Sequence, residues 1–100
     1  MSAQEQSTKS RSEISHYNWV IDPTKYERDG DIAPDRTRRV LISNGPTFGV
    51  AVHINDFFVG GLDPRQEKFF DAAPGQPVEV RLVDKGETES NFGQMIFLDA

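Results

Sequence analysis

The sequence predicts an all-β fold, namely a small single-domain antiparallel β-sandwich of about seven strands with a polar N-terminal arm. Short apolar segments recur along the chain, and the clearest of them, Phe48–Ile54, alternates with a period of two residues. Turn residues such as Asn44–Gly45–Pro46 and Pro74–Gly75 separate these segments. A length of 100 residues favours one domain. Short alternating strands separated by turns are typical of two packed sheets.

The first part of the chain is expected to supply a flexible arm and one strand. Residues 1–13 are rich in Ser, Gln, Glu and Lys, which bury too little apolar surface to offset the entropy of ordering. We therefore expect a flexible polar arm at 1–13 and the β-sandwich domain at 14–100. The first strand of that domain is expected at Ile14–Ile21, where Trp19 lies on the alternating apolar face and Pro23 follows.

After this strand we expect a long irregular loop at 22–39. It holds two prolines and the Asp29–Gly30 pair, and it has room for one short helical turn at Thr24–Glu27. Asn55–Asp56 is expected to form a two-residue hairpin turn, because both residues tolerate positive φ. The remaining six strands are expected at Arg39–Ser43, Phe48–Ile54, Phe57–Val59, Glu67–Asp71, Val78–Val83 and Phe92–Leu98.

A segment of the second half resembles a known family of small β modules. Val52–Pro64 reads VHINDFFVGGLDP, and Pro74–Val80 then reads PGQPVEV. This pattern is similar to that of PEGA-type β-sandwich modules, in which a hairpin leads through a Val-Gly step to a proline and a Pro-Gly turn opens a Val-x-Val strand. Asp56 stands where that pattern has the turn glycine. The resemblance implies a β-sandwich that is non-catalytic and acts in protein interaction, usually outside the cytoplasm.

Composition excludes several classes of protein. The chain has no cysteine, which excludes a disulfide framework, a thiol nucleophile and a cysteine-ligated metal site. The longest apolar run, Met95–Leu98, is far shorter than the roughly 18 residues of a membrane helix, so we expect no membrane insertion. Residues 1–13 lack the apolar stretch of a secretory signal. We therefore expect a cytoplasmic or virion-associated protein.

The charge is distributed unevenly. Residues 1–39 carry seven Lys or Arg and seven Asp or Glu, whereas residues 40–100 carry four and nine, so the whole net charge of −5 belongs to the second part. Arg36, Arg38 and Arg39 form a small basic cluster. Because an acidic strand domain repels phosphates over most of its surface, we expect no nucleic-acid binding.

No motif in the chain predicts catalysis, a metal or a cofactor. His16 and His53 lie on separate expected strands without a second ligand at metal-binding spacing. Asp29, Asp31 and Asp35 are closely spaced, but Ala33 occupies the third ligand position of an EF-hand loop and the closing glutamate is missing. A solvated turn is the simpler interpretation of this loop, and a low-affinity cation site stays open. We expect no enzymatic activity and no cofactor.

Doubled apolar residues are the most informative feature of the surface. Consecutive strand residues point to opposite faces, so one member of each pair should leave the core. Such an outer face must be covered by another part of the chain or by another protein. The hypothesis is that Phe57 or Phe58, together with Phe69 or Phe70, forms one binding patch on an outer sheet face. The residues expected at a protein interface are Phe57, Phe58, Phe69, Phe70 and Trp19.

These observations predict a protein that works by contact. The function expected is a structural or accessory subunit of a larger assembly, such as a capsid-decorating or tail-associated protein of a bacteriophage virion, with copies of itself or other subunits as partners. One alternative is a small acidic inhibitor that occludes an enzyme or a nucleic-acid-binding protein. A further alternative is a PEGA-like interaction module. Salt distinguishes the first two, because apolar contacts tolerate salt whereas contacts through an acidic face weaken.

Overall fold

The computed structural model describes residues 12–100, so residues 1–11 of the predicted arm at 1–13 lie outside the described residues. The end of that predicted arm belongs to the sheet. Glu13 begins the first strand, and the backbone N–H of Asp99 donates to the carbonyl oxygen of Ser12 at 2.9 Å. The ordered domain therefore starts slightly before residue 14.

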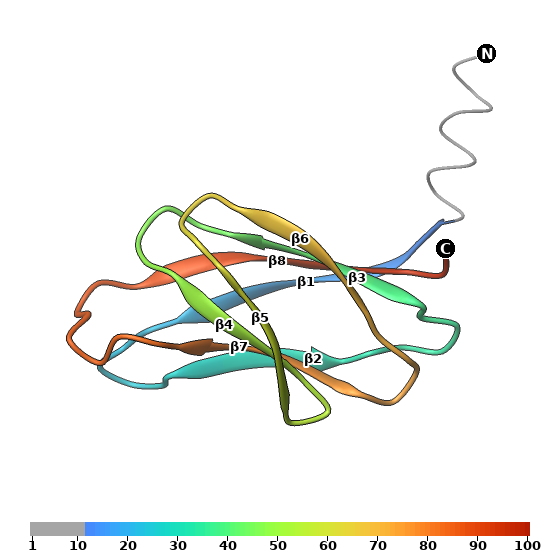
Figure 1. The fold of residues 1–100 in the computed structure, drawn as a ribbon, viewed down its shortest axis with the longest axis horizontal. Coiled ribbons are helices and arrows are strands. Elements are labelled where there is room, and N and C mark those ends of the chain that lie inside the picture. Colours follow the sequence, from blue (N-terminus) through green and yellow to red (C-terminus); the bar gives the residue numbers. More distant parts are fainter. Residues whose placement is uncertain (1–11) are drawn as a thin grey trace, which may run out of the picture.

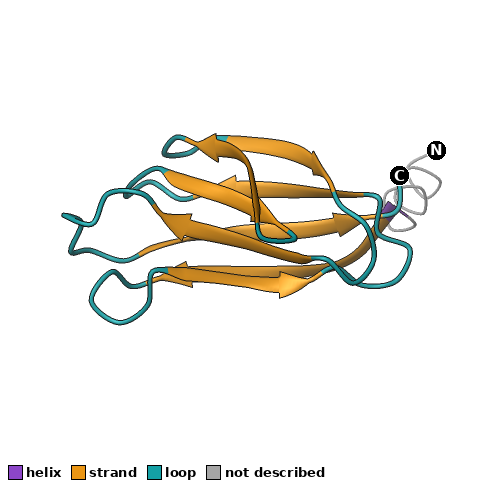
Figure 2. Cartoon of the chain, turned by 60° about the horizontal axis from the view of Figure 1, so that its bottom comes forward, coloured by secondary structure: helices purple, strands orange, loops and turns teal. Residues whose placement is uncertain are grey.

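The described residues form two antiparallel sheets of four strands each, as the predicted β-sandwich requires (Figure 1). One sheet has the order β1-β8-β3-β6 and the other β2-β7-β4-β5. Loops gather at the two ends of the layers (Figure 2). Within residues 12–100 no helix is long and apolar enough to cross a membrane. The strands are β1 (Glu13–Ile21), β2 (Arg28–Ile32), β3 (Arg39–Asn44), β4 (Val50–Ile54), β5 (Phe57–Leu62), β6 (Glu67–Asp71), β7 (Pro77–Leu82) and β8 (Asn91–Leu98).

The expected irregular loop at 22–39 is wrong in its middle, where β2 pairs with β7 from Arg28 opposite Arg81 to Ile32 opposite Pro77. This raises the number of strands in the described chain from seven to eight. Aspartate and glycine are unusual in strands, but here they suit an edge. The carboxylate of Asp29 accepts from the backbone N–H of Gly30 and that of Asp31 from the N–H of Ile32, each at 2.9 Å.

The helical turn expected at Thr24–Glu27 is absent from the described chain. The structure instead has a tight turn in which the N–H groups of Lys25 and Tyr26 both donate to the carbonyl oxygen of Asp22, each at 2.8 Å. Asp22 and Tyr26 also form an isolated β-bridge. The carboxylate of Asp22 accepts from the backbone N–H of Thr24 at 3.1 Å, which makes an Asx turn, and from Thr24 Oγ1 at 2.8 Å.

The core lies between the two sheets and is built from the alternating residues of each strand. The buried apolar residues, each less than a tenth exposed, are Trp19, Ile21, Ala33, Val40, Ile42, Phe48, Val50, Val52, Ile54, Leu62, Ala72, Val78, Val80, Met95 and Phe97. Trp19 is the largest of them and lies opposite Gly93 of β8. A Cβ atom at Gly93 would overlap the carbonyl oxygen of Ser43 and lie 2.5 Å from Cζ2 of Trp19. The absence of a side chain at Gly93 therefore leaves space for the indole of Trp19.

Two buried asparagines close the core at the end where β3 finishes and β8 starts. Asn91 Nδ2 donates to Asn44 Oδ1 at 2.9 Å, and each side-chain amide also donates to the carbonyl oxygen of Phe48 at 2.9 Å. Buried amides are tolerated when their polar atoms are paired in this way. The pair joins β3, β8 and the segment before β4, and so fixes the surface around Gly93.

Candidate protein-interaction site

The β4–β5 hairpin is closed by the predicted Asn55–Asp56 turn. Asn55 has φ 53° and Asp56 has φ 70°, as a two-residue type I′ turn requires. Asn and Asp reach this left-handed region at lower cost than other non-glycine residues. The N–H of Asn55 donates to the carbonyl oxygen of Pro77 at 2.9 Å, which ties the turn to the start of β7.

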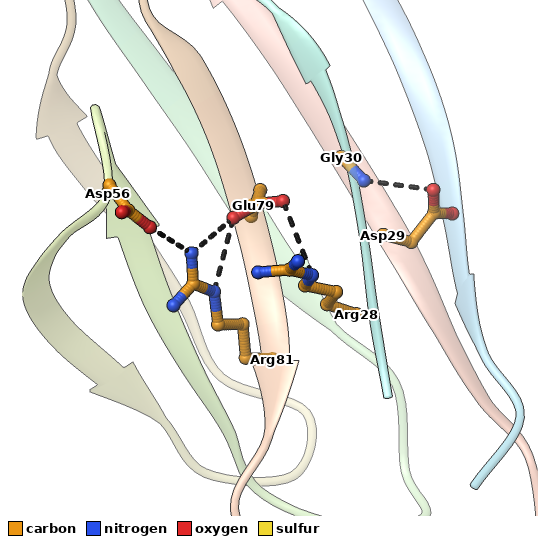
Figure 3. A network of polar contacts seen from close by, with 6 residues as sticks. All are labelled: Arg28, Asp29, Gly30, Asp56, Glu79 and Arg81. Atoms are coloured by element: carbon orange, nitrogen blue, oxygen red, sulfur yellow. Dashed lines mark hydrogen bonds and ion pairs between the residues drawn. The ribbon is translucent and has the colours of Figure 1, made fainter. Parts of the chain in front are cut away.

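A network of charges holds the turn against the outer face of its sheet (Figure 3). Arg81 Nη2 donates to Asp56 Oδ1 and to Glu79 Oε1, both at 2.6 Å. The hydrogen bond from Arg81 lowers the pKa of Asp56, and the charge of Arg81 lowers it further. Arg28 Nε lies 4.0 Å from the other oxygen of Glu79. These contacts tie the hairpin turn to the neighbouring strand β7.

Three apolar side chains project from this hairpin, and we call them the tip surface: Phe57, Phe58 and Val59. Their exposed fractions are 70%, 65% and 44%. The register shifts between Val52 and His53, so that Phe58 pairs with His53 and Gly60 with Val52, which leaves Val59 as the bulged residue. The ring of Phe58 meets that of His53 edge to face at 5.7 Å. Phe57 has no such ring contact among those that the structure shows within residues 12–100.

Phe69 lies on the other sheet, and its ring is 54% exposed. It pairs with Leu41 of β3, which in turn pairs with Ile96 of β8, so the three share the outer face of that sheet. The guanidinium of Arg39 stands 4.6 Å from the centre of the Phe69 ring, a cation–π contact that covers one of its faces. We call Phe69, Leu41 and Ile96 the β6 surface.

Phe70 is only partly buried and packs on the core from the inner side of β6. Its ring approaches Gly60, where a Cβ atom would lie 3.1 Å from Cε1 of Phe70. Phe70 is thus a rim residue between the two sheets and offers little of its ring to a partner.

The assignment of Trp19 to a protein interface is wrong, because its side chain is completely buried. Trp19 and Ile21 alternate toward the core and Gly93 leaves space for the indole. The inward alternation was the correct signal for this residue. Its neighbour Val20 is the member of the apolar run that leaves the core, and it is 39% exposed.

Phe58 and Phe69 do not lie on one patch, which removes that pairing from the sequence hypothesis. Phe58 shares the outer face of β4 with His53, whereas Phe69 shares the outer face of β3 with Leu41. Those two faces belong to different sheets and point away from each other in a sandwich. Phe58 and Phe69 therefore belong to two separate apolar surfaces, whereas Phe57, which pairs with the buried Ile54, lies on the other side of the hairpin from Phe58.

A pocket of about 340 Å³ lies at the start of β8, and it was not among the sites expected from the sequence. We call it the β8 pocket; its lining residues are Asn18, Trp19, Val20, Ser43, Asn44, Gly45, Phe92, Gly93 and Gln94. Phe92 pairs with Val20 and is 58% exposed, which gives the pocket an apolar wall. The signal in the sequence was the Phe92–Gly93 step, where a large residue precedes a glycine in an alternating strand.

The acidic residues Asp29, Asp31 and Asp35 are not brought together as ligands. Asp29 accepts from the hydroxyl of Tyr17 at 2.7 Å and from the N–H of Val20 at 2.9 Å, which joins β2 to β1 across the edge of the sandwich. The carboxylate of Asp31 accepts from the backbone N–H of Ile32 in its own strand. Asp35 is exposed beyond the end of β2. Among residues 12–100 no three His, Cys, Asp or Glu side chains are grouped as a metal ion would require.

The two histidines lie on different sheets. His16 is exposed on β1, with Nδ1 3.7 Å from the carboxylate of Glu13. His53 lies on the outer face of β4 beneath Phe58. Burial, reinforced by the charge of Arg81, lowers the pKa of His53, so its ring is neutral at neutral pH and supports the packing of Phe58.

Comparison with family models, with curated proteins and with solved structures finds no match in any of the three. The resemblance of Val52–Val80 to PEGA-type modules therefore stays a prediction.

Proposed function

We propose that this protein is a structural or accessory subunit that acts by contact within a larger protein assembly. The observation that carries the proposal is the exposure of Phe57, Phe58 and Phe69. These three side chains lie outside the buried core. Exposed clusters of large apolar side chains mark surfaces where proteins meet. A bacteriophage virion, in which the chain would decorate the capsid or join the tail, is the setting that we propose.

The energetics favour burial of these rings against a partner. Complete burial of a phenylalanine contributes about 1.5–3 kcal/mol, so two exposed rings at the tip surface contribute several kcal/mol once covered. Aromatic residues that are held in place before binding lose little further entropy. Phe58 meets this condition through His53, and the whole hairpin meets it through the Arg81–Asp56 bond of 2.6 Å.

The sheet edges support contact through side chains rather than through added strands. On β2 the carboxylates of Asp29 and Asp31 occupy the N–H groups of the next residues. On β5 the bulge at Val59 interrupts the edge, and Lys68 Nζ donates to the carbonyl oxygen of Gly61 at 3.0 Å. Bulges and edge lysines are common protections against edge pairing. The apolar side chains are therefore the available means of association at these edges.

The proposal is tested in the cells that carry this gene, with a tagged wild-type copy and a tagged triple variant F57S/F58S/F69S. We expect the wild type to purify in a large particle of fixed stoichiometry, visible by electron microscopy, at both low and high salt. The triple variant, whose substitutions lie on the surface, should purify outside that particle. Recovery of the wild type as a monomer would contradict the proposal, as would recovery of the triple variant in the same particle.

The same purification separates the alternative of an acidic inhibitor. An inhibitor would appear as a one-to-one complex that high salt dissociates, because its contact would be electrostatic. The matched control is the single variant E89Q, which removes one exposed carboxylate of the 40–100 segment that belongs to neither the tip surface nor the β6 surface. It should leave a particle that is held together by apolar contacts unchanged.

A further inference from the structure

We propose that the β8 pocket receives Phe57 from a second copy of this chain, so that copies associate head to tail. The inference rests on the proposed contact function and names one of its partners. It joins two features that are otherwise unexplained. One is the most exposed of the large apolar side chains within residues 12–100, and the other is an apolar pocket on the same molecule.

The size and chemistry of the pocket suit a phenyl ring. A cavity of about 150 Å³ accepts benzene, and the β8 pocket measures about 340 Å³. Val20 and Phe92 form its exposed apolar wall. Exposed amides of Asn18 and Gln94, joined by a hydrogen bond of 3.1 Å, lie at its rim.

The charges around the two surfaces permit this approach. The β8 pocket is lined by residues without charge. Asp56, the acidic residue of the tip, is paired with Arg81 at 2.6 Å. A second pocket, of about 580 Å³ near the start of β4, is lined by Asp63, Asp84 and Glu87 as well as Lys68. Its charged lining suits a phenyl ring less well, so the uncharged β8 pocket is the better receptor.

The placement of the two surfaces makes the contact intermolecular. The tip is tied to Pro77, at the end of the sandwich where residues 33–38 and 72–76 connect the sheets. The β8 pocket lies where β3 finishes and β8 starts, on the other sheet. Figure 1 shows the β4–β5 turn at the lower edge and the start of β8 at the left. A contact between two different surfaces repeats from copy to copy and gives a ring or a filament.

Trp19, the one tryptophan of the chain, is among the residues that line the pocket, but its side chain is completely buried and belongs to the core. Its buried Nε1–H has no hydrogen-bond partner within the described residues.

The test is a complementation experiment on the purified chain by sedimentation velocity. F57K removes the tip and keeps the pocket, whereas V20K keeps the tip and blocks the pocket. We expect the wild type to sediment as rings or filaments and each variant alone as a monomer. An equal mixture of the two retains one intact contact per pair and should sediment at twice the monomer mass.

Two further variants serve as controls. F92K blocks the pocket from its other wall and should behave as V20K does, and circular dichroism should show that each variant keeps its strands. I32K is the matched control, because it changes an exposed apolar residue of β2, outside the tip surface, the β6 surface and the β8 pocket, in the same way and should associate as the wild type does. A mixture that stays monomeric, or a V20K that associates like the wild type, would overturn the inference.

Failure here and failure of the proposed function give different results. A wild-type chain that is monomeric when pure, yet is found in a particle in cells, would overturn the head-to-tail contact and keep the contact function. A chain that is monomeric in both settings would contradict both.

Discussion

At the scale of the residue, Gly93 governs both the core and the β8 pocket. We predict that Gly93→Ala destabilises the fold by about 2 kcal/mol or more, in the range of an overpacked core. The physical reason is that the new Cβ overlaps the carbonyl oxygen of Ser43 and approaches Cζ2 of Trp19 to 2.5 Å. Urea denaturation measures the loss. Gly75→Ala is the steric control, since a Cβ there meets no atom within 4 Å, although its φ of 84° adds backbone strain. A Gly93→Ala loss no larger than that of Gly75→Ala would contradict the account.

Tyr17 shows how one hydroxyl joins the two sheets. Its hydrogen bond to Asp29, together with burial, raises the pKa of Tyr17 to about 12 from 10.0. We predict that Tyr17→Phe lowers the free energy of unfolding by about 1–2 kcal/mol at neutral pH, as expected for a hydrogen bond to a charged acceptor.

The contribution of Tyr17 to the free energy of unfolding should decrease at alkaline pH. Because the pKa is higher in the folded state, the contribution of the neutral phenol is complete below pH 10.0 and is lost as the pH rises toward about 12. The stability difference between the wild type and Tyr17→Phe should therefore narrow over this window. Denaturation of both proteins at a series of alkaline pH values checks it, and a constant difference would contradict the assignment.

At the scale of the element, the β4–β5 hairpin is set by its turn. We predict that Asn55→Ala destabilises the protein by about 1 kcal/mol, because alanine pays the full cost of a left-handed conformation at φ 53°. Asn55→Gly is the matched control and should be close to neutral, since glycine adopts this region freely. Thermal unfolding of the three proteins gives the comparison. Equal stability of the Ala and Gly variants would show that the turn geometry is not the cause.

Seven of the eight strands of the described chain could be predicted from the sequence, because their apolar residues alternate or lie between clear turn signals. β2 could not, because Arg28–Ile32 reads RDGDI and has the composition of a loop. What makes it a strand is tertiary: β7 offers a free edge, and Asp29 reaches across to Tyr17 and Val20. Propensity gives way to such context.

The candidate site was predictable only in part. Phe57, Phe58 and Phe69 were identified because doubled aromatic residues place one ring outside a sheet. The separation of these rings onto two sheets depends on strand order, which the sequence does not reveal. The β8 pocket depends on the pairing of Val20 with Phe92 and of Trp19 with Gly93, residues more than 70 positions apart.

At the scale of the whole molecule, the net charge opposes self-association and the exposed apolar surface favours it. The chain has a net charge of −5, so copies repel one another at low salt. We predict that raising the salt concentration strengthens self-association or leaves it unchanged, because salt screens this repulsion while apolar contacts persist. Sedimentation across a salt series measures the effect. Dissociation of the assembly by salt would point instead to an electrostatic interface.

The central claim is that the exposed aromatic rings are covered in the working assembly. Hydroxyl-radical footprinting of the assembled protein and of the dissociated chain measures this most directly, residue by residue. We predict that modification of Phe57 and Phe58 falls on assembly to the level of Phe97, a phenylalanine that is already fully buried in the single chain. Modification of Phe57 and Phe58 at the same rate in both states would contradict the claim.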